Sequence, residues 1–158
     1  MASKMARKQK QHYVDNKKFL QEITNYRLAV EAAKRNDEEK PRITHYLAEC
    51  FLKIATHLSY RPNFINYMYK DDMVCDGIEN CIQYIDNFDP TKSRNPFAYF
   101  TQIVYHAFLR RIAKEKRQMD IKDKILEKSG YDHVFTVDGE GGADYNQIKN
   151  RVEMNTKR

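Results

Sequence analysis

Apolar residues recur at three- and four-residue steps through most of the first 116 positions, and this spacing constrains the fold more than any other feature. It is the spacing of a helix with one buried face. The clearest case lies between positions 43 and 58, where the apolar positions are Ile43, Leu47, Cys50, Phe51, Ile54 and Leu58. No segment before residue 130 alternates in the manner of a strand. The sequence therefore predicts an all-α fold, a compact helical domain.

Three further segments show the same spacing, each with its own apolar residues. The first is a helix that Asn16 could cap, with Phe19, Leu20, Ile23, Tyr26 and Val30 as its apolar stripe. The second is predicted from Asp71 to Phe88, with a core line of Val74, Ile78, Cys81, Ile85 and Phe88. The third is predicted from Pro96 to about Lys116 or on to Lys128, and its buried residues are Phe97, Phe100, Val104, Phe108 and Ile112.

Proline residues separate the last two of these helices. The residue before a proline is driven out of the helical region, so Asp89-Pro90 should stop one helix. Asn95-Pro96 should start the next, as its cap and its first residue. Two helices are therefore expected to lie close together across a short turn.

The ends of the chain differ in composition from this helical middle. Residues 1–12 are basic and almost devoid of apolar side chains, which is typical of a flexible arm. Residues 129–158 hold a short apolar run, a Gly-rich linker and a polar tail. The predicted organisation is a basic arm over 1–12, a helical domain over 13–128 and a tail over 129–158.

Charge and cysteine usage narrow the range of functions. The chain has 28 Lys and Arg against 22 Asp and Glu, a net charge of +6, which favours a polyanionic partner. Its three cysteines lie in apolar helical patterns, so we expect neither a disulfide framework nor a zinc site, and no other metal or cofactor. No apolar run approaches the ~20 residues that span a bilayer, so we predict a cytoplasmic protein with no membrane partner.

The predicted helix from Asp71 to Phe88 carries an acidic stripe opposite its core line. At 3.6 residues per turn this stripe consists of Asp72, Asp76, Glu79, Gln83 and Asp86. A solvated surface is the ordinary explanation of such a stripe. However, no basic residue occurs from Asp71 to Asp89, although i,i+4 pairs of Glu and Lys would stabilise an exposed helix. The uncompensated carboxylates favour a cationic partner.

The next predicted helix carries the opposite kind of stripe. An aromatic ring, an amide, an imidazole and guanidinium groups on one face can stack on bases, reach base edges and hold phosphates. This stripe consists of Tyr99, Gln102, Ile103, His106, Arg110 and Arg117, flanked by Arg111, Lys114 and Lys116. We interpret it as a nucleic-acid surface.

At these residues the chain resembles region 2 of the sigma-70 family, the specificity factors of bacterial RNA polymerase. The matching positions are Asp72, Asp76, Gly77, the Asp86-Asn87-Phe88-Asp89-Pro90 segment, Tyr99, Thr101 and Arg110-x-Ile112-Ala113. His12-Tyr13-Val14-Asp15-Asn16-Lys17 and Asn95-Pro96-Phe97-Ala98-Tyr99-Phe100-Thr101-Gln102 resemble the short late-transcription sigma factors of T-even-type phages. The resemblance covers roughly residues 12 to 120.

The resemblance implies docking on the clamp helices of the largest polymerase subunit. The matching positions there are Asp72, Cys75, Asp76, Ile78 and Ile82, of which Cys75 and Ile78 depart from the polar residues usual in the family. With the rest of the acidic stripe, the predicted polymerase-binding residues are Asp72, Cys75, Asp76, Ile78, Glu79, Ile82 and Gln83.

The resemblance also implies roles on promoter DNA. Tyr99 matches the tyrosine that stacks on a flipped minus-ten adenine, and Gln102 and Ile103 replace a tryptophan pair that normally wedges the melted region. His106 and Leu109 match positions that contact the upstream end of the minus-ten element, and Arg110 matches a basic residue nearby. The full predicted DNA-binding set is Tyr99, Gln102, Ile103, His106, Leu109, Arg110, Arg111, Lys114 and Arg117.

Nothing in the sequence resembles the family's helix-turn-helix for the minus-35 element. The resemblance therefore implies an AT-rich minus-ten element alone, with upstream contacts left to a phage coactivator and the DNA sliding clamp, in the cytoplasm of the host cell. The alternatives are a free-standing helical DNA- or RNA-binding regulator and a nuclease that uses Asp71 and Asp72 with His106. Those acids lie on a different predicted helix from His106, so we expect no enzymatic activity.

Overall fold

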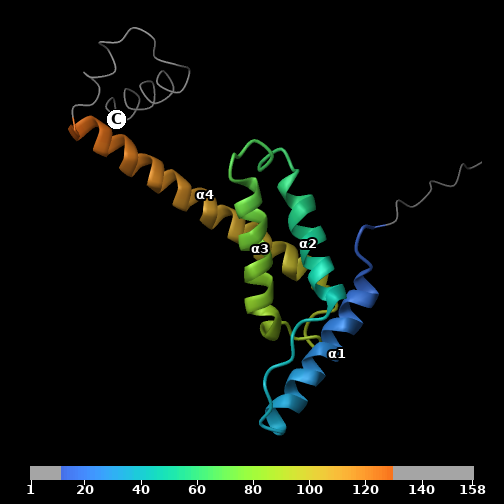
Figure 1. Ribbon diagram of the computed structural model, residues 1–158. Coiled ribbons are helices and arrows are strands. Elements are labelled where there is room, and N and C mark those ends of the chain that lie inside the picture. Colours follow the sequence, from blue (N-terminus) through green and yellow to red (C-terminus); the bar gives the residue numbers. More distant parts are fainter. Residues whose placement is uncertain (1–11, 130–158) are drawn as a thin grey trace, which may run out of the picture. The chain divides into compact units, whose positions relative to one another are not determined.

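The computed structural model describes residues 12–129, and every regular secondary-structure element in that range is a helix. They are α1 (Asn16–Arg35), α2 (His45–Ser59), α3 (Lys70–Tyr84), the short 3₁₀ helix η1 (Ile85–Asn87) and α4 (Pro96–Ser129) (Figure 1). The predicted all-α class is confirmed. The basic arm, apart from His12, and the tail beyond Ser129 lie outside the described residues.

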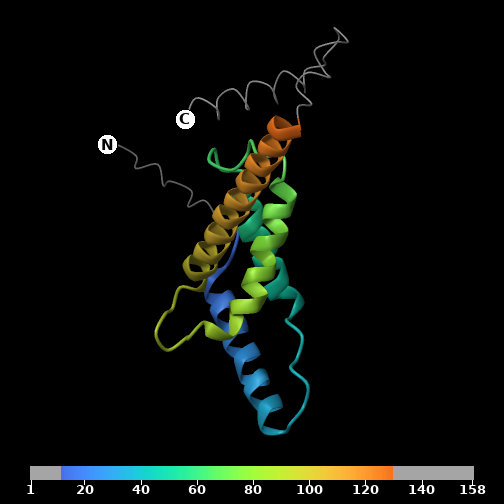
Figure 2. The same cartoon turned by 90° about the vertical axis from the view of Figure 1, so that its left-hand side faces the viewer.

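The chain divides into two compact units, Met1–Leu109 and Arg110–Arg158. The first contains α1, α2, α3, η1 and the start of α4, and the second contains the rest of α4. Within the first unit, α2 and α3 lie side by side and are joined by a loop at one end (Figure 1). Residues 36–44 return along α1 to the start of α2 (Figure 2).

Side-chain caps mark the starts of α1 and α4. Asp15, not the predicted Asn16, caps α1, because its carboxylate accepts hydrogen bonds from the backbone N–H groups of Lys17 and Lys18. Asn16 instead reaches α4, where its Oδ1 accepts from the N–H of Phe97 at 3.2 Å. Asn95 caps α4 as predicted, with its Oδ1 accepting from the N–H of Ala98 at 3.1 Å. The sequence could not assign the role of Asn16, because its partner is 81 residues away.

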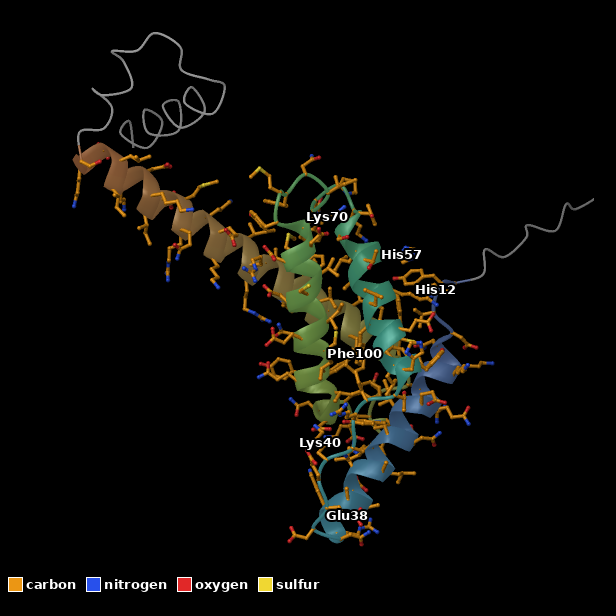
Figure 3. The ribbon with its side chains drawn as sticks, in the orientation of Figure 1. His12, Glu38, Lys40, His57, Lys70 and Phe100 are labelled. Atoms are coloured by element: carbon orange, nitrogen blue, oxygen red, sulfur yellow. The ribbon has the colours of Figure 1, made fainter. Side chains whose placement is uncertain are left out.

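Aromatic rings fill the centre of the first unit, and Phe100 is in the middle of them (Figure 3). Its ring lies 4.8 Å from that of Phe51, 5.6 Å from Phe19 and 6.0 Å from Phe88, measured between centroids. All four side chains are fully buried. One ring of α4 therefore ties together α1, α2 and the segment that follows α3.

The core line predicted for α3 is partly wrong. Cys81, Ile85 and Phe88 are buried as expected, but Val74 and Ile78 are only half-buried. The buried residues of the helix itself are Met73, Gly77 and Cys81. The helix is turned so that Gly77 faces α4, where an added Cβ would lie 3.0 Å from Val104 and 3.3 Å from Phe108. Gly77 thus permits a close approach of the two helices.

The end of α3 also differs from the prediction. The α-helix stops at Tyr84, not Phe88, and tightens into η1 before the Asp89-Pro90 turn. Tight 3₁₀ turns are common at helix ends. Phe88 leaves the helix with an extended backbone, which directs its ring into the core.

Candidate functional site

The outer surface of α3 bears acidic and apolar side chains together. Asp72, Cys75, Glu79, Ile82 and Gln83 are all exposed, and we call this set the acidic face. These residues are exposed because Met73, Gly77 and Cys81 pack against the interior, so residues on the opposite side of the helix face outward. Among the described residues, no ion pair joins Asp72 or Glu79 to a cation.

Three predicted members of this region lie differently. Asp76 and Ile78 are half-buried, and Asp76 takes part in an interaction within the protein. Asp86 is exposed but pairs with Lys40. This hydrogen bond raises the pKa of Lys40 above its ordinary value. Lys40 is 46 residues away in the sequence, so the stripe pattern gave no sign of this pairing.

Asp89 ends the acidic stretch and is held by its neighbours. Its Oδ1 accepts hydrogen bonds from the Thr91 hydroxyl at 2.7 Å and the Thr91 N–H at 2.9 Å. Arg27 lies 3.7 Å from the same oxygen. These bonds to Thr91, with the nearby positive charges, hold the pKa of Asp89 below its usual value. This carboxylate is therefore part of the folded scaffold.

The predicted nucleic-acid residues of the first unit lie on α4 and differ in exposure. Gln102, His106 and Leu109 are exposed, whereas Tyr99 and Ile103 are half-buried. The Tyr99 ring lies 5.2 Å from the buried ring of Phe88 and 5.1 Å from that of Phe100. Burial raises the pKa of Tyr99 above its ordinary value, and the phenol, like that of any tyrosine, is a neutral hydrogen-bond donor at pH 7. The ring is thus anchored in the core and open to solvent on its remaining surface.

The basic predicted residues belong to the second unit. Arg110, Lys114 and Arg117 are exposed. Arg111 is half-buried, with its Nη1 3.3 Å from Glu115 Oε1. Arg110 also has an interaction within the protein. Lys114 and Arg117 are therefore the more available of the predicted phosphate-binding residues.

Sequence reasoning missed one aromatic residue of α4 altogether. Tyr105 is exposed, and its ring lies 5.7 Å from the buried Phe64 and 5.9 Å from His106. It was absent from the predicted stripe because it immediately precedes His106, and consecutive residues of a helix point in different directions. Its contact with Phe64, in the loop after α2, could not be predicted from the spacing of residues along α4.

The described residues show neither a group of three His, Cys, Asp or Glu placed to hold a metal ion nor a helix long and apolar enough to cross a membrane. No protein-family model matches the sequence, and no protein of curated function matches it significantly. Function is therefore inferred from the acidic face of α3 and the exposed side chains of α4.

Proposed function

We propose that the chain is a sigma-type initiation factor that docks on bacterial core RNA polymerase and directs it to an AT-rich minus-ten promoter element. The observation that carries this proposal is the separation of charge between the exposed surfaces of α3 and α4. Asp72 and Glu79 lie outward on α3, in a stretch with no Lys or Arg from Asp71 to Thr91. From Pro90 to Lys114 the chain has no Asp or Glu.

The acidic face has the composition of a docking surface. Exposed Cys75 and Ile82 lie beside the carboxylates, so an apolar contact can be desolvated while the charges orient the partner. A partner with basic side chains around an apolar strip would complement it. The sigma resemblance implies that this partner is the clamp helices of the largest polymerase subunit.

Tyr99 is the residue proposed to capture an unpaired base. Opening about ten base-pair steps at a mean near 1.4 kcal/mol costs on the order of 14 kcal/mol, whereas one base stacked on an aromatic ring returns roughly 1 to 3. The helix cannot melt DNA alone, and the polymerase channel supplies the remainder. Gln102 and Ile103 stand where the family has its tryptophan pair, so less of the opening energy comes from this helix.

The remaining predicted residues have supporting roles. Gln102, His106 and Leu109 are exposed on α4 and can contact the upstream edge of the element. Lys114 and Arg117 can hold phosphates. A coactivator and the sliding clamp of the phage would provide upstream contacts, and the factor would act in the host cytoplasm.

The test is capture of bacterial core RNA polymerase by the full chain. Asp72→Lys/Glu79→Lys reverses two exposed charges and should abolish capture, with the fold checked by circular dichroism. Glu38→Lys/Glu39→Lys is the matched control, because it makes the same charge change at two exposed residues between α1 and α2 and should leave capture intact.

Failure of the wild-type chain to bind a matched host polymerase would reject the proposal. The part of α4 from Pro96 to Lys114, which has no Asp or Glu, favours a specific second candidate in that case, a free-standing DNA- or RNA-binding regulator. Such a protein would bind duplex DNA with no polymerase present. Equal capture by the wild type and the α3 variant would instead move the docking site away from the acidic face.

A further inference from the structure

The loop between α2 and α3 exposes aromatic and apolar side chains that no part of the proposed function uses. Tyr60 is 58% exposed, Ile65 45% and Met68 97%. Single exposed apolar residues are ordinary, but three within nine positions form a patch. The loop is therefore a candidate binding surface.

The loop and the end of α2 that precedes it carry only positive charge. No Asp or Glu occurs from Cys50 to Lys70, while Arg61 and Lys70 lie at the two ends of the loop. Lys70 Nζ lies 4.1 Å from the centroid of the Tyr60 ring, a cation–π contact. A positive charge thus lies over one face of the most exposed aromatic ring of the loop. This combination complements a ligand with flat rings and negative charge.

The backbone of the loop is ordered by its own hydrogen bonds. The N–H groups of Phe64 and Ile65 donate to the carbonyl of Arg61 at 2.9 and 3.0 Å, and that of Arg61 donates to Leu58 at 3.1 Å. Phe64 is buried and anchors the loop in the core, with its ring 5.2 Å from that of Phe108. Binding at a loop that is already shaped loses less conformational entropy.

The same anchor places the loop beside the candidate nucleic-acid surface. The Phe64 ring lies 5.7 Å from Tyr105, which neighbours His106 on α4. Both the loop and this part of α4 are free of acidic residues and belong to the first unit. In Figure 3, Lys70 marks the junction of the loop with α3.

We propose that the loop from Tyr60 to Lys70 is a binding site for a single strand of nucleic acid, continuing the α4 surface at Tyr105. A base stacks on the face of Tyr60 opposite Lys70, and Arg61 and Lys70 hold the adjoining phosphates. Met68, with its polarizable sulfur, adds apolar contact with a second base. A single strand is favoured over a duplex because stacking on a side chain requires an unstacked base.

The test is fluorescence anisotropy of a labelled 20-nucleotide dT strand with the full-length chain, in the absence of polymerase. Tyr60→Ala should weaken binding about tenfold, within the range for one stacked base. Tyr60→Phe should restore it, because the ring is kept. Tyr84→Ala is the matched control, since Tyr84 is 40% exposed on the acidic α3 and should have no effect on the dT strand.

Salt dependence tests the phosphate contacts separately. Arg61→Gln/Lys70→Gln should lower the slope of log affinity against log salt by about 1.4, since each phosphate contact on a single strand accounts for about 0.7. An unchanged slope would remove both residues from the site. Circular dichroism of each variant shows whether the fold is intact.

Three results would overturn the proposal. These are undiminished dT binding by Tyr60→Ala, an equal loss with Tyr84→Ala, or an equal loss on a 20-base-pair duplex. Undiminished dT binding together with weaker capture of polymerase would assign the loop to a protein partner. Because the assay contains no polymerase, its outcome is independent of whether the acidic face docks as proposed.

Discussion

The exposed surfaces of α3 and α4 differ in charge although the two helices share one interior. Gly77 of α3 lies against Val104 and Phe108 of α4, so the helices are closely packed. Outward, α3 presents Asp72 and Glu79, whereas α4 presents neutral and imidazole side chains and leads into arginines and lysines. Charge is thus separated between α3 and the part of α4 up to Lys114, an arrangement that would suit the two partners of opposite charge in the proposed function.

α3 lacks a local stabilisation that α1 and α2 have. α1 and α2 contain i,i+4 ion pairs, between Arg27 and Glu31 and between Glu49 and Lys53. α3 has no basic residue after Lys70 with which its acids could pair in this way. Such pairs stabilise a helix by only ~0.2–0.5 kcal/mol each. A helix that is held by tertiary packing can therefore form without them. The difference is what we expect if the carboxylates are kept for a partner.

The largest effect should come from removing the interior that both surfaces share. Phe100→Ala deletes a fully buried ring in contact with Phe19, Phe51 and Phe88, and should lower the free energy of unfolding by about 3–5 kcal/mol. Urea denaturation followed by circular dichroism measures this. Polymerase capture and DNA binding should then fail together. If one survived undiminished, its surface would not depend on this core.

A smaller and more selective effect is expected at Tyr99. Tyr99→Ala should reduce open-complex formation about 10- to 100-fold, the range for one lost stack, while core polymerase is still captured. Permanganate footprinting of the melted promoter measures it. Tyr99→Phe keeps the ring beside Phe88 and Phe100 and should behave as the wild type. Loss of capture as well as opening in Tyr99→Ala would indicate misfolding instead.

Cysteine reactivity can sharpen the assignment of the acidic face. Cys75 is exposed, whereas Cys50 and Cys81 are buried, and burial raises the pKa of Cys81 to about 12. Only Cys75 should therefore react rapidly with iodoacetamide at pH 7.5. Bound core polymerase should slow that reaction about tenfold or more, as measured by mass spectrometry of the alkylated peptide. An unchanged rate in the complex would place Cys75 outside the interface.

Much of the fold follows from residues close together in the sequence. Apolar spacing and the Asn95-Pro96 start signal were enough to predict the helices and the beginning of α4. What was wrong depended on tertiary contacts. Asn16 was expected to cap α1 but binds α4, and Met73 and Gly77 replace Val74 and Ile78 at the centre of the α3 interface. Local periodicity does not determine which of two adjacent apolar lines meets the next helix.

The features of the candidate site also divide into those that local sequence predicts and those that depend on tertiary contacts. The outward positions of Asp72, Glu79 and Gln83 agree with the helical projection. The pairing of Asp86 with Lys40 and the partial burial of Tyr99 depend on distant segments. The importance of the loop after α2 could not be predicted from the sequence, because it depends on Phe64 joining this loop to α4.

The smallest effect is expected at Asp89, whose carboxylate is part of the folded scaffold. Asp89→Asn should weaken the bonds to Thr91 and the attraction to Arg27, and so lower the melting temperature slightly at pH 7. The pKa of Asp89 is lower in the folded protein than in the unfolded chain, where it is about 3.9. Its stabilising contribution is therefore present above about pH 4 and is lost as the pH falls through the folded value.

Thermal melts at several pH values test this directly. The difference between Asp89→Asn and the wild type should be largest near neutral pH and should shrink as the pH falls below about 4. Glu39→Gln, at an exposed position in the connection between α1 and α2, is the matched control and should melt as the wild type. A constant difference at all pH values would mean that Asp89 acts through packing and not through its charge. Asp89 would then still serve the fold, and Asp72 and Glu79 would remain the candidate docking carboxylates.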